Sequence, residues 1–179
     1  MDCKTMITLF VEKNNPLTPN FYNNLIASLQ FHRMLCPCCG HSGCLSVHGY
    51  YIRFLKTPAG TLPFRICRVI CSCCNHTHAL IPSSMVPYSQ ISLEEHVQII
   101  SAHETREKWD TIMNHNPYID ESSCRHIIRR FLRHWKQRLF SEKITPADRT
   151  ALVRGCFSAF ARQFMQIHCT PNILFMNTT

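Results

Sequence analysis

The chain has 179 residues and a formal net charge of +8, from 19 lysines and arginines against 11 acidic residues. This length allows one ordinary domain or two small ones, and 45% hydrophobic residues exclude a largely disordered chain. Its apolar runs fall short of the ~20 residues of a membrane helix, and the apolar start is too short for a signal peptide. We therefore expect a cytoplasmic, nucleoid-associated protein whose partners are polyanions and not membranes.

The first thirty residues predict a strand over 6–11 and a short helix over 19–29, and they contain no motif. The remaining chain changes character several times, from cysteine-rich to proline-rich to helical. We predict an α+β protein with five segments: an N-terminal extension (1–30), a zinc ribbon (31–81), a linker (82–91), a helix-turn-helix-like helical domain (92–142), and a C-terminal helix with a tail (143–179).

Six of the twelve cysteines lie in two clusters, Cys36-Pro37-Cys38-Cys39-Gly40 and Cys71-Ser72-Cys73-Cys74-Asn75. Each cluster contains a C-x-x-C pair, which places two thiolates on one side of a metal ion. In a reducing compartment, clustered cysteines indicate metal or redox chemistry and not a disulfide scaffold. A redox C-x-x-C normally occurs once, whereas two pairs that flank a hairpin favour a Zn²⁺ site. The predicted ligands are Cys36, Cys39, Cys71 and Cys74.

Other ligand choices stay open, because further thiols and imidazoles lie close by in the sequence. The candidates for a swapped ligand are Cys38, Cys67, Cys73, His76 and His78. Four thiolates leave no open coordination position, so the predicted site is structural and not catalytic. Four thiolates and one Zn²⁺ would lower the net charge to about +6.

The residues between the clusters predict a β-hairpin, with strands over 45–56 and 62–70 joined by a Pro58-Ala59-Gly60 turn. Between residues 31 and 90 there are five lysines and arginines, five histidines and no acidic residue. A solvated surface normally mixes charges of both signs, so this imbalance favours contact with phosphate groups. The predicted phosphate contacts of the hairpin are Arg53, Lys56, Arg65 and Arg68.

Beyond the linker, the hydrophobic pattern becomes helical. Ser92 and Glu95 predict a capping box for a helix that ends near Glu104, and Thr105 is expected to cap a second helix that ends near His115. A further helix is predicted within 145–167, where Pro146 stands in the first turn.

The longest predicted helix runs from Asp120 to about Phe140. Its expected core stripe consists of Cys124, Ile128, Phe131, Trp135 and Leu139, widened by Ile127 and Leu132. Its other faces are cationic, and a helix of this kind fits the major groove of duplex DNA. The residues expected near base edges are Ser122, Ser123, Arg125, His126, Arg129 and Arg130. Arg133, Lys136 and Arg138 are expected near the DNA backbone.

The sequence does not match the catalytic motifs of the enzyme classes considered, which are metalloproteases, deaminases and two-metal nucleases. His103-Glu104 lacks the second histidine of H-E-x-x-H, and the deaminase signature fails after Cys38. The acidic residues are too dispersed for a two-metal nuclease centre. The chain is therefore predicted to be a non-enzyme that binds double-stranded DNA. RNA binding and a role as a protein–protein adaptor remain the alternatives, and salt dependence would separate them.

Several short motifs support a resemblance to a known group of proteins. Cys36-Pro37-x-Cys39-Gly40, His48-Gly49-Tyr50-Tyr51-x-Arg53 and Arg65-Ile66-Cys67-Arg68 resemble the N-terminal zinc-binding region of bacterial insertion-sequence transposases. Over about residues 31–142 the chain also resembles short zinc-ribbon proteins of Gram-positive bacteria. The resemblance implies DNA recognition as an accessory or regulatory factor of a mobile element, with a transposase as a further partner. The acidic catalytic domain of such transposases is missing from this sequence.

Overall fold

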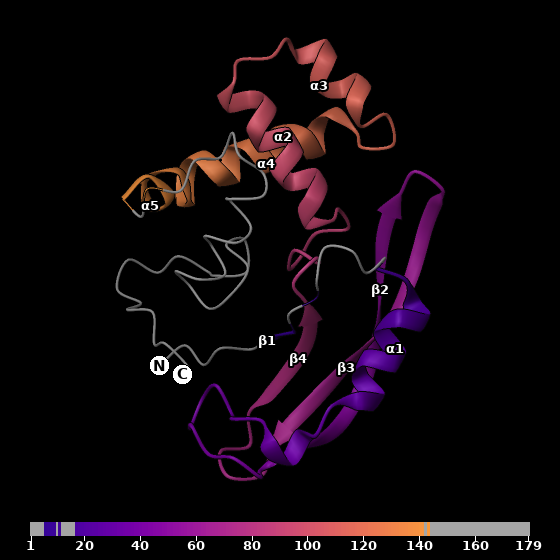
Figure 1. Cartoon of the computed structure of the whole chain (residues 1–179), viewed down its shortest axis with the longest axis vertical. Helices are drawn as coiled ribbons and strands as arrows, with labels where there is room; N and C mark the ends of the chain where they lie inside the picture. Colours follow the sequence, from indigo (N-terminus) through magenta and orange to yellow (C-terminus); the bar gives the residue numbers. More distant parts are fainter. Residues whose placement is uncertain (1–5, 10, 12–16, 142, 144–179) are drawn as a thin grey trace. The chain divides into compact units, whose positions relative to one another are not determined.

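The computed structural model describes residues 6–9, 11, 17–141 and 143. The protein belongs to the α+β class, as predicted, with a four-stranded sheet and several helices (Figure 1). It divides into two compact units. Of the described residues, unit 1 contains those up to Leu55 and Thr61–Ser83, and unit 2 contains Lys56–Gly60 and those from Ser84 onward.

The sheet has the strand order β1-β4-β3-β2, so the first strand in sequence lies at the opposite edge from the second. Its strands are β1 (Met6–Leu9), β2 (Leu45–Thr57), β3 (Gly60–Cys71) and β4 (Thr77–Pro82). β1 pairs with β4 in parallel, and β4 pairs with β3 in antiparallel orientation. The predicted hairpin is therefore confirmed, whereas β4 was not predicted. The segment expected to be an N-terminal extension supplies an edge strand to this sheet.

The helix α1 (Pro19–Ser28) packs along the hairpin of unit 1 (Figure 1). Its Tyr22 is buried, and the ring meets Phe64 of β3 edge to face, with 6.3 Å between the centroids. The Tyr22 hydroxyl accepts a 2.9 Å hydrogen bond from the Cys67 N–H of β3 and donates one of 2.9 Å to the Leu80 carbonyl of β4. Tyr22 thus satisfies backbone groups of two neighbouring strands.

Unit 2 is helical, with α2 (Leu93–Glu104), α3 (Trp109–His115), α4 (Glu121–His134) and α5 (Lys136–Ser141). An apolar cluster that runs from Val86 to Leu139 forms its core. Ser92 caps α2, because its Oγ accepts the Glu95 N–H at 3.4 Å. In a complete capping box, the Glu95 side chain would also accept the backbone N–H of Ser92. Here the Glu95 carboxylate instead accepts a 2.7 Å hydrogen bond from the Tyr118 hydroxyl. None of the described helices is long and apolar enough to cross a bilayer.

Three details of the helical predictions are wrong. Thr105 does not cap the second helix: it ends α2, and α3 begins at Trp109 after Lys108, because Arg106 has a left-handed backbone with φ of 60°. The longest predicted helix is interrupted at Trp135, which has φ of −122°, and continues as α5. Leu132 is 44% exposed, although the other residues of the predicted stripe are buried. The helix predicted within 145–167 lies outside the described residues.

Candidate functional site

The two C-x-x-C segments of unit 1 fold into nearly identical turns. In each turn the carbonyl of the first cysteine accepts a 2.8 Å hydrogen bond, from the N–H of Gly40 in one turn and of Asn75 in the other. Gly40 and Asn75 both have left-handed backbones, with φ of 75° and 57°. Glycine and asparagine reach this region at low cost. The residue after each C-x-x-C pair is therefore suited to the turn that it completes.

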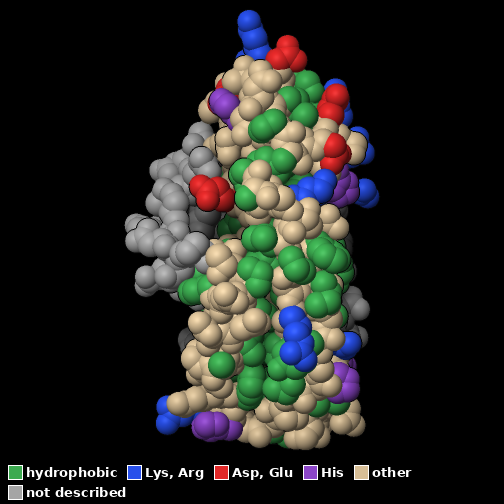
Figure 2. Space-filling model, turned by 90° about the vertical axis from the view of Figure 1, so that its right-hand side faces the viewer, with side chains coloured by type: hydrophobic (Ala, Val, Ile, Leu, Met, Phe, Trp, Pro, Cys, Tyr) green, Lys and Arg blue, Asp and Glu red, His purple; other side chains and the backbone are tan. Residues whose placement is uncertain are grey.

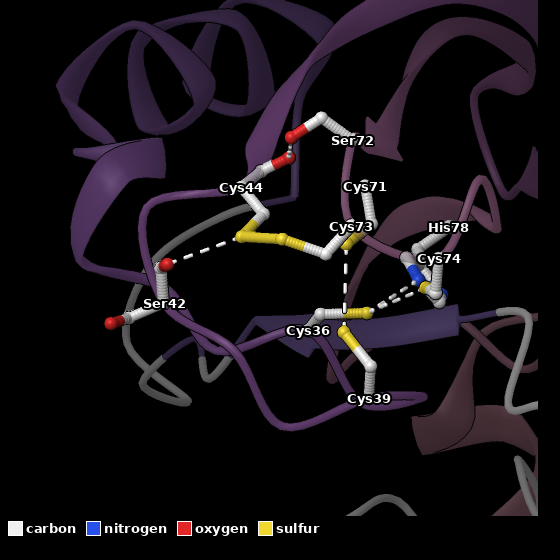
Figure 3. Close-up of a disulfide and its surroundings, with 9 residues drawn as sticks. All are labelled: Cys36, Cys39, Ser42, Cys44, Cys71, Ser72, Cys73, Cys74 and His78. Carbon is white, nitrogen blue, oxygen red and sulfur yellow. Dashed lines mark hydrogen bonds between the residues drawn. A yellow bond between two sulfur atoms is a disulfide. The ribbon is translucent and has the colours of Figure 1, made fainter.

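The two turns bring the four predicted ligands together, although the pairs are far apart in sequence (Figure 3). The Sγ atoms of Cys36, Cys39, Cys71 and Cys74 lie within 4.8 Å of one another. The shortest distances are 3.7 Å between Cys36 and Cys74 and 3.6 Å between Cys39 and Cys71. Sulfurs at 2.3 Å from a tetrahedral Zn²⁺ stand about 3.8 Å apart. The four thiols could therefore hold a metal ion.

The surroundings of the four sulfurs differ from one ligand to the next. Burial raises the pKa of Cys36 to about 12, and the Nε2 of the fully buried His78 lies 3.4 Å from its sulfur. Burial also opposes ionisation of Cys71, but the backbone N–H groups of Cys74 and Cys73 outweigh it and lower the Cys71 pKa to about 7. Such N–H···S contacts stabilise thiolates and fix ligand orientation around a metal.

Two further groups overlap with the set of four among the described residues: Cys38, Cys74 and His76, and Cys44, Cys71 and Cys73. Each offers three ligands instead of four. In the second group, Cys44 and Cys73 are joined by a disulfide (Figure 3). Sequence reasoning missed this pair, although Cys44 and Cys73 are equally distant from the Pro58–Ala59 turn. The hairpin register itself could have placed them opposite each other.

The basic residues of the hairpin fall in different places. The Arg65 guanidinium lies over the Tyr50 ring, with 4.0 Å from Cζ to the centroid. The exposed Arg68 donates to the Thr77 hydroxyl at 2.8 Å, and Arg53 is half-buried. Lys56 belongs to unit 2, where its Nζ lies 3.4 Å from an Asp120 oxygen.

Unit 2 contains a groove with a volume of about 520 Å³ at the start of α4. We name it the α4 groove. All six residues predicted to lie near base edges line it, together with Lys56. The remaining lining comes from Tyr88, Ser89, Gln90, Ile91, His96 and Ile127. The lining contains four lysines and arginines and two histidines but no acidic residue. The linker residues of this groove were not predicted as site residues, and no motif in the sequence marks them.

Some of the groove residues already have structural contacts. The hydroxyls of Ser122 and Ser123 donate to the Asp120 carboxylate at 2.6 and 2.8 Å, and the Ser123 N–H donates to it at 2.8 Å. Asp120 is thus the N-cap of α4. Arg125 pairs with Glu121 at 2.6 Å and lies 4.7 Å from the centroid of the Trp109 ring. These contacts hold the first turn of α4 in place.

Other predicted contacts lie farther along the helices. His126, Arg129 and Arg133 are exposed on α4, and Arg130 is half-buried. Among the described residues, neither Arg129 nor Arg133 forms an ion pair with a carboxylate. Lys136 of α5, in contrast, binds the Glu104 carboxylate at 2.8 Å. Among the predicted contacts on these helices, the cations most available to an external anion are therefore Arg129 and Arg133, in the second half of α4.

The chain matches the family described as Domain of unknown function (DUF6431) over residues 36–127, and it belongs to this family. The matched region begins at the first metal-ligand candidate and ends within α4, so it includes the complete cysteine cluster. No curated protein and no solved structure matches the chain.

Proposed function

We propose that this member of the DUF6431 family is a zinc-stabilised protein that binds double-stranded DNA. In this proposal, the hairpin and its two cysteine turns form a zinc ribbon, and α2, α3 and α4 act as a helix-turn-helix-type unit. The metal is a structural Zn²⁺ ion, because four thiolates suit a soft, four-coordinate ion and leave no position for a substrate.

The α4 groove is the observation that carries the proposal. Residues selected from the sequence for DNA contact line one concave surface without a carboxylate, although they come from the hairpin tip and from α4. A helix of this width enters the major groove of B-form DNA, where arginine can bind guanine with two hydrogen bonds. Arg129 is the candidate for base contact, because it lines the groove and is exposed.

Phosphate binding would come from cations around this helix. Arg133 is exposed one turn beyond Arg129, and Lys56 approaches from the hairpin tip. Ser122 and Ser123 keep the N-terminus of α4 capped through Asp120, so their contribution is to position the helix. The resemblance to transposase DNA-binding regions supports an accessory or regulatory role at a mobile element.

The substitution Arg129→Gln tests this assignment. It preserves a good helix former but removes the charge and the guanidinium fork, so DNA affinity should fall by about 1–3 kcal/mol and the preference at one base pair should relax. A gel-shift titration on a duplex selected from a random pool measures both effects. The control is Arg106→Gln, an equal loss of charge at an exposed position outside the groove lining. Equal affinities of the two variants would contradict the assignment of Arg129.

A further inference from the structure

Unit 1 carries a row of exposed apolar side chains on β2, the edge strand of the sheet. Tyr50, Ile52 and Phe54 are 44%, 56% and 47% exposed, and their alternate positions place them on the same side of the strand. Figure 2 shows hydrophobic side chains gathered around a lysine or arginine side chain in the lower half of the view. A row of this kind on an edge strand is costly in water unless a partner covers it.

The row is completed by a cation from the neighbouring strand. Arg65 of β3 stacks on Tyr50, with 4.0 Å between Cζ and the ring centroid. A guanidinium in this position neutralises an anion beside the ring and offers its own planar surface for stacking. His48 is exposed two positions before Tyr50 and extends the row. The surface therefore combines flat rings with positive charge.

The charges around the row indicate the kind of partner. Between residues 31 and 90 the sequence has no acidic residue, so no carboxylate of this stretch would repel an anion. Side chains two residues apart on a strand are separated by about 6.8 Å. His48 and Tyr50 therefore lie about 6.8 Å apart, and Tyr50 and Phe54 about twice as far, with Ile52 between them. Rings along a strand, with cations alongside, are what proteins use to stack unpaired bases while binding the backbone.

We propose that the row formed by His48, Tyr50, Ile52 and Phe54, together with Arg65, binds single-stranded DNA. Unpaired bases stack on Phe54 and on the Arg65 guanidinium that covers Tyr50, and Arg65 also binds a phosphate while it remains stacked on Tyr50. This inference rests on the proposed function for its choice of DNA over RNA, since a helix such as α4 reads the major groove of B-form DNA and not that of A-form RNA. The ligand is then DNA with both paired and unpaired parts.

The test uses the full zinc-loaded chain and fluorescence anisotropy with labelled oligothymidine and with a blunt duplex. Phe54→Leu preserves apolar area but removes the ring, and it should weaken oligothymidine binding by about 5- to 150-fold. The same variant should leave duplex affinity unchanged. Phe54→Tyr is the matched control, because it preserves a ring and should bind oligothymidine like the natural chain. Arg129→Gln should show the reverse pattern, with weaker duplex binding only.

Each other outcome overturns the inference in a recognisable way. Duplex binding without oligothymidine binding contradicts the single-strand site but not the proposed function, whereas failure to bind either ligand contradicts both. Ring stacking is supported if Phe54→Leu and Phe54→Ala lose the same oligothymidine affinity while Phe54→Tyr keeps the affinity of the natural chain. Unchanged oligothymidine affinity in Phe54→Leu contradicts ring stacking. Tighter binding to oligouridine than to oligothymidine contradicts the choice of DNA. A dimer in light scattering that Phe54→Ala dissociates would assign the row to a second copy of the chain.

Discussion

The two units of this protein obtain their stability from different sources. Unit 2 has a continuous apolar core in which large side chains such as Phe131 and Trp135 are fully buried. Unit 1 buries apolar side chains such as Tyr22, Phe64 and Leu80 and also gathers seven cysteines at one end of its sheet. The comparison teaches that hydrophobic periodicity is enough to build the helical unit, whereas unit 1 also brings together four thiols that could hold a metal ion.

The largest expected effect is the loss of the metal ligands in unit 1. Cys71→Ser removes one of four thiolates, and because structural zinc supplies about 10–16 kcal/mol of apparent binding energy in small domains, the variant should lose both metal and sheet structure. Elemental analysis and amide hydrogen exchange of the sheet measure these losses. Cys38→Ser is the matched control in the neighbouring turn. If Cys38→Ser lost the metal and Cys71→Ser kept it, the ligand assignment would be wrong.

Unit 2 should be destabilised by the loss of a buried apolar side chain and not by the loss of a thiol. Phe131→Ala deletes a fully buried ring from the core of the helices and should cost about 3–5 kcal/mol of unfolding free energy, without altering the metal content. The adjacent Leu132→Ala, on an exposed side chain, should change stability by no more than about 0.5 kcal/mol. Thermal unfolding with parallel metal analysis tests both. Loss of metal in Phe131→Ala would show that the stability of the two units is not separable.

A smaller effect is expected from a single hydroxyl in unit 1. Tyr22→Phe preserves the ring contact with Phe64 but leaves the Cys67 N–H and the Leu80 carbonyl without this partner. Buried backbone groups without partners cost about 1–3 kcal/mol. Denaturant unfolding and faster exchange of the Cys67 amide measure this cost. If the unfolding free energy and the exchange rate of the Cys67 amide were both unchanged, a water molecule would have replaced the hydroxyl.

The smallest effect concerns the N-cap of α4. Asp120→Ala should cost about 1 kcal/mol, and Asp120→Asn less, because asparagine keeps an acceptor. Hydrogen bonds from Ser122 and Ser123, aided by Lys56, lower the pKa of Asp120. Its stabilising contribution is therefore present above the unfolded pKa of about 3.9 and is lost as the pH falls towards the folded value. The difference in unfolding free energy between the natural chain and Asp120→Ala, measured by denaturant unfolding, should shrink below about pH 4. A difference that stays constant with pH would contradict this expectation.

Local signals in the sequence were sufficient for much of the fold and the site. The spacing of Cys36, Cys39, Cys71 and Cys74 predicted the cluster, since two equal turns on one hairpin must meet. The cap at Ser92 and the start of a helix at Asp120 were also visible, because a side-chain acceptor near a helix start acts within one turn.

Features that depend on residues far apart in the chain could not be predicted from the sequence. Strand β4 is defined by pairing with β3 and with the remote β1, and the apolar residues Leu80 and Ile81 alone do not distinguish a strand from a linker. The break at Trp135 interrupts a pattern that is periodic on both sides of it. The walls of the α4 groove come from Tyr88 and Gln90, whose role arises only when the linker packs beside α4.

Salt dependence of duplex binding tests the central claim most directly. The affinity of the zinc-loaded chain for a blunt duplex is measured by fluorescence anisotropy at several salt concentrations. If Lys56 and Arg133 each neutralise a phosphate and displace its counterions, the logarithm of the association constant should fall linearly with the logarithm of salt concentration, by about 0.9 per phosphate contact. Each Arg→Gln substitution at a phosphate contact should reduce the slope by about 1. Affinity independent of salt, or no binding at low salt, would contradict the account.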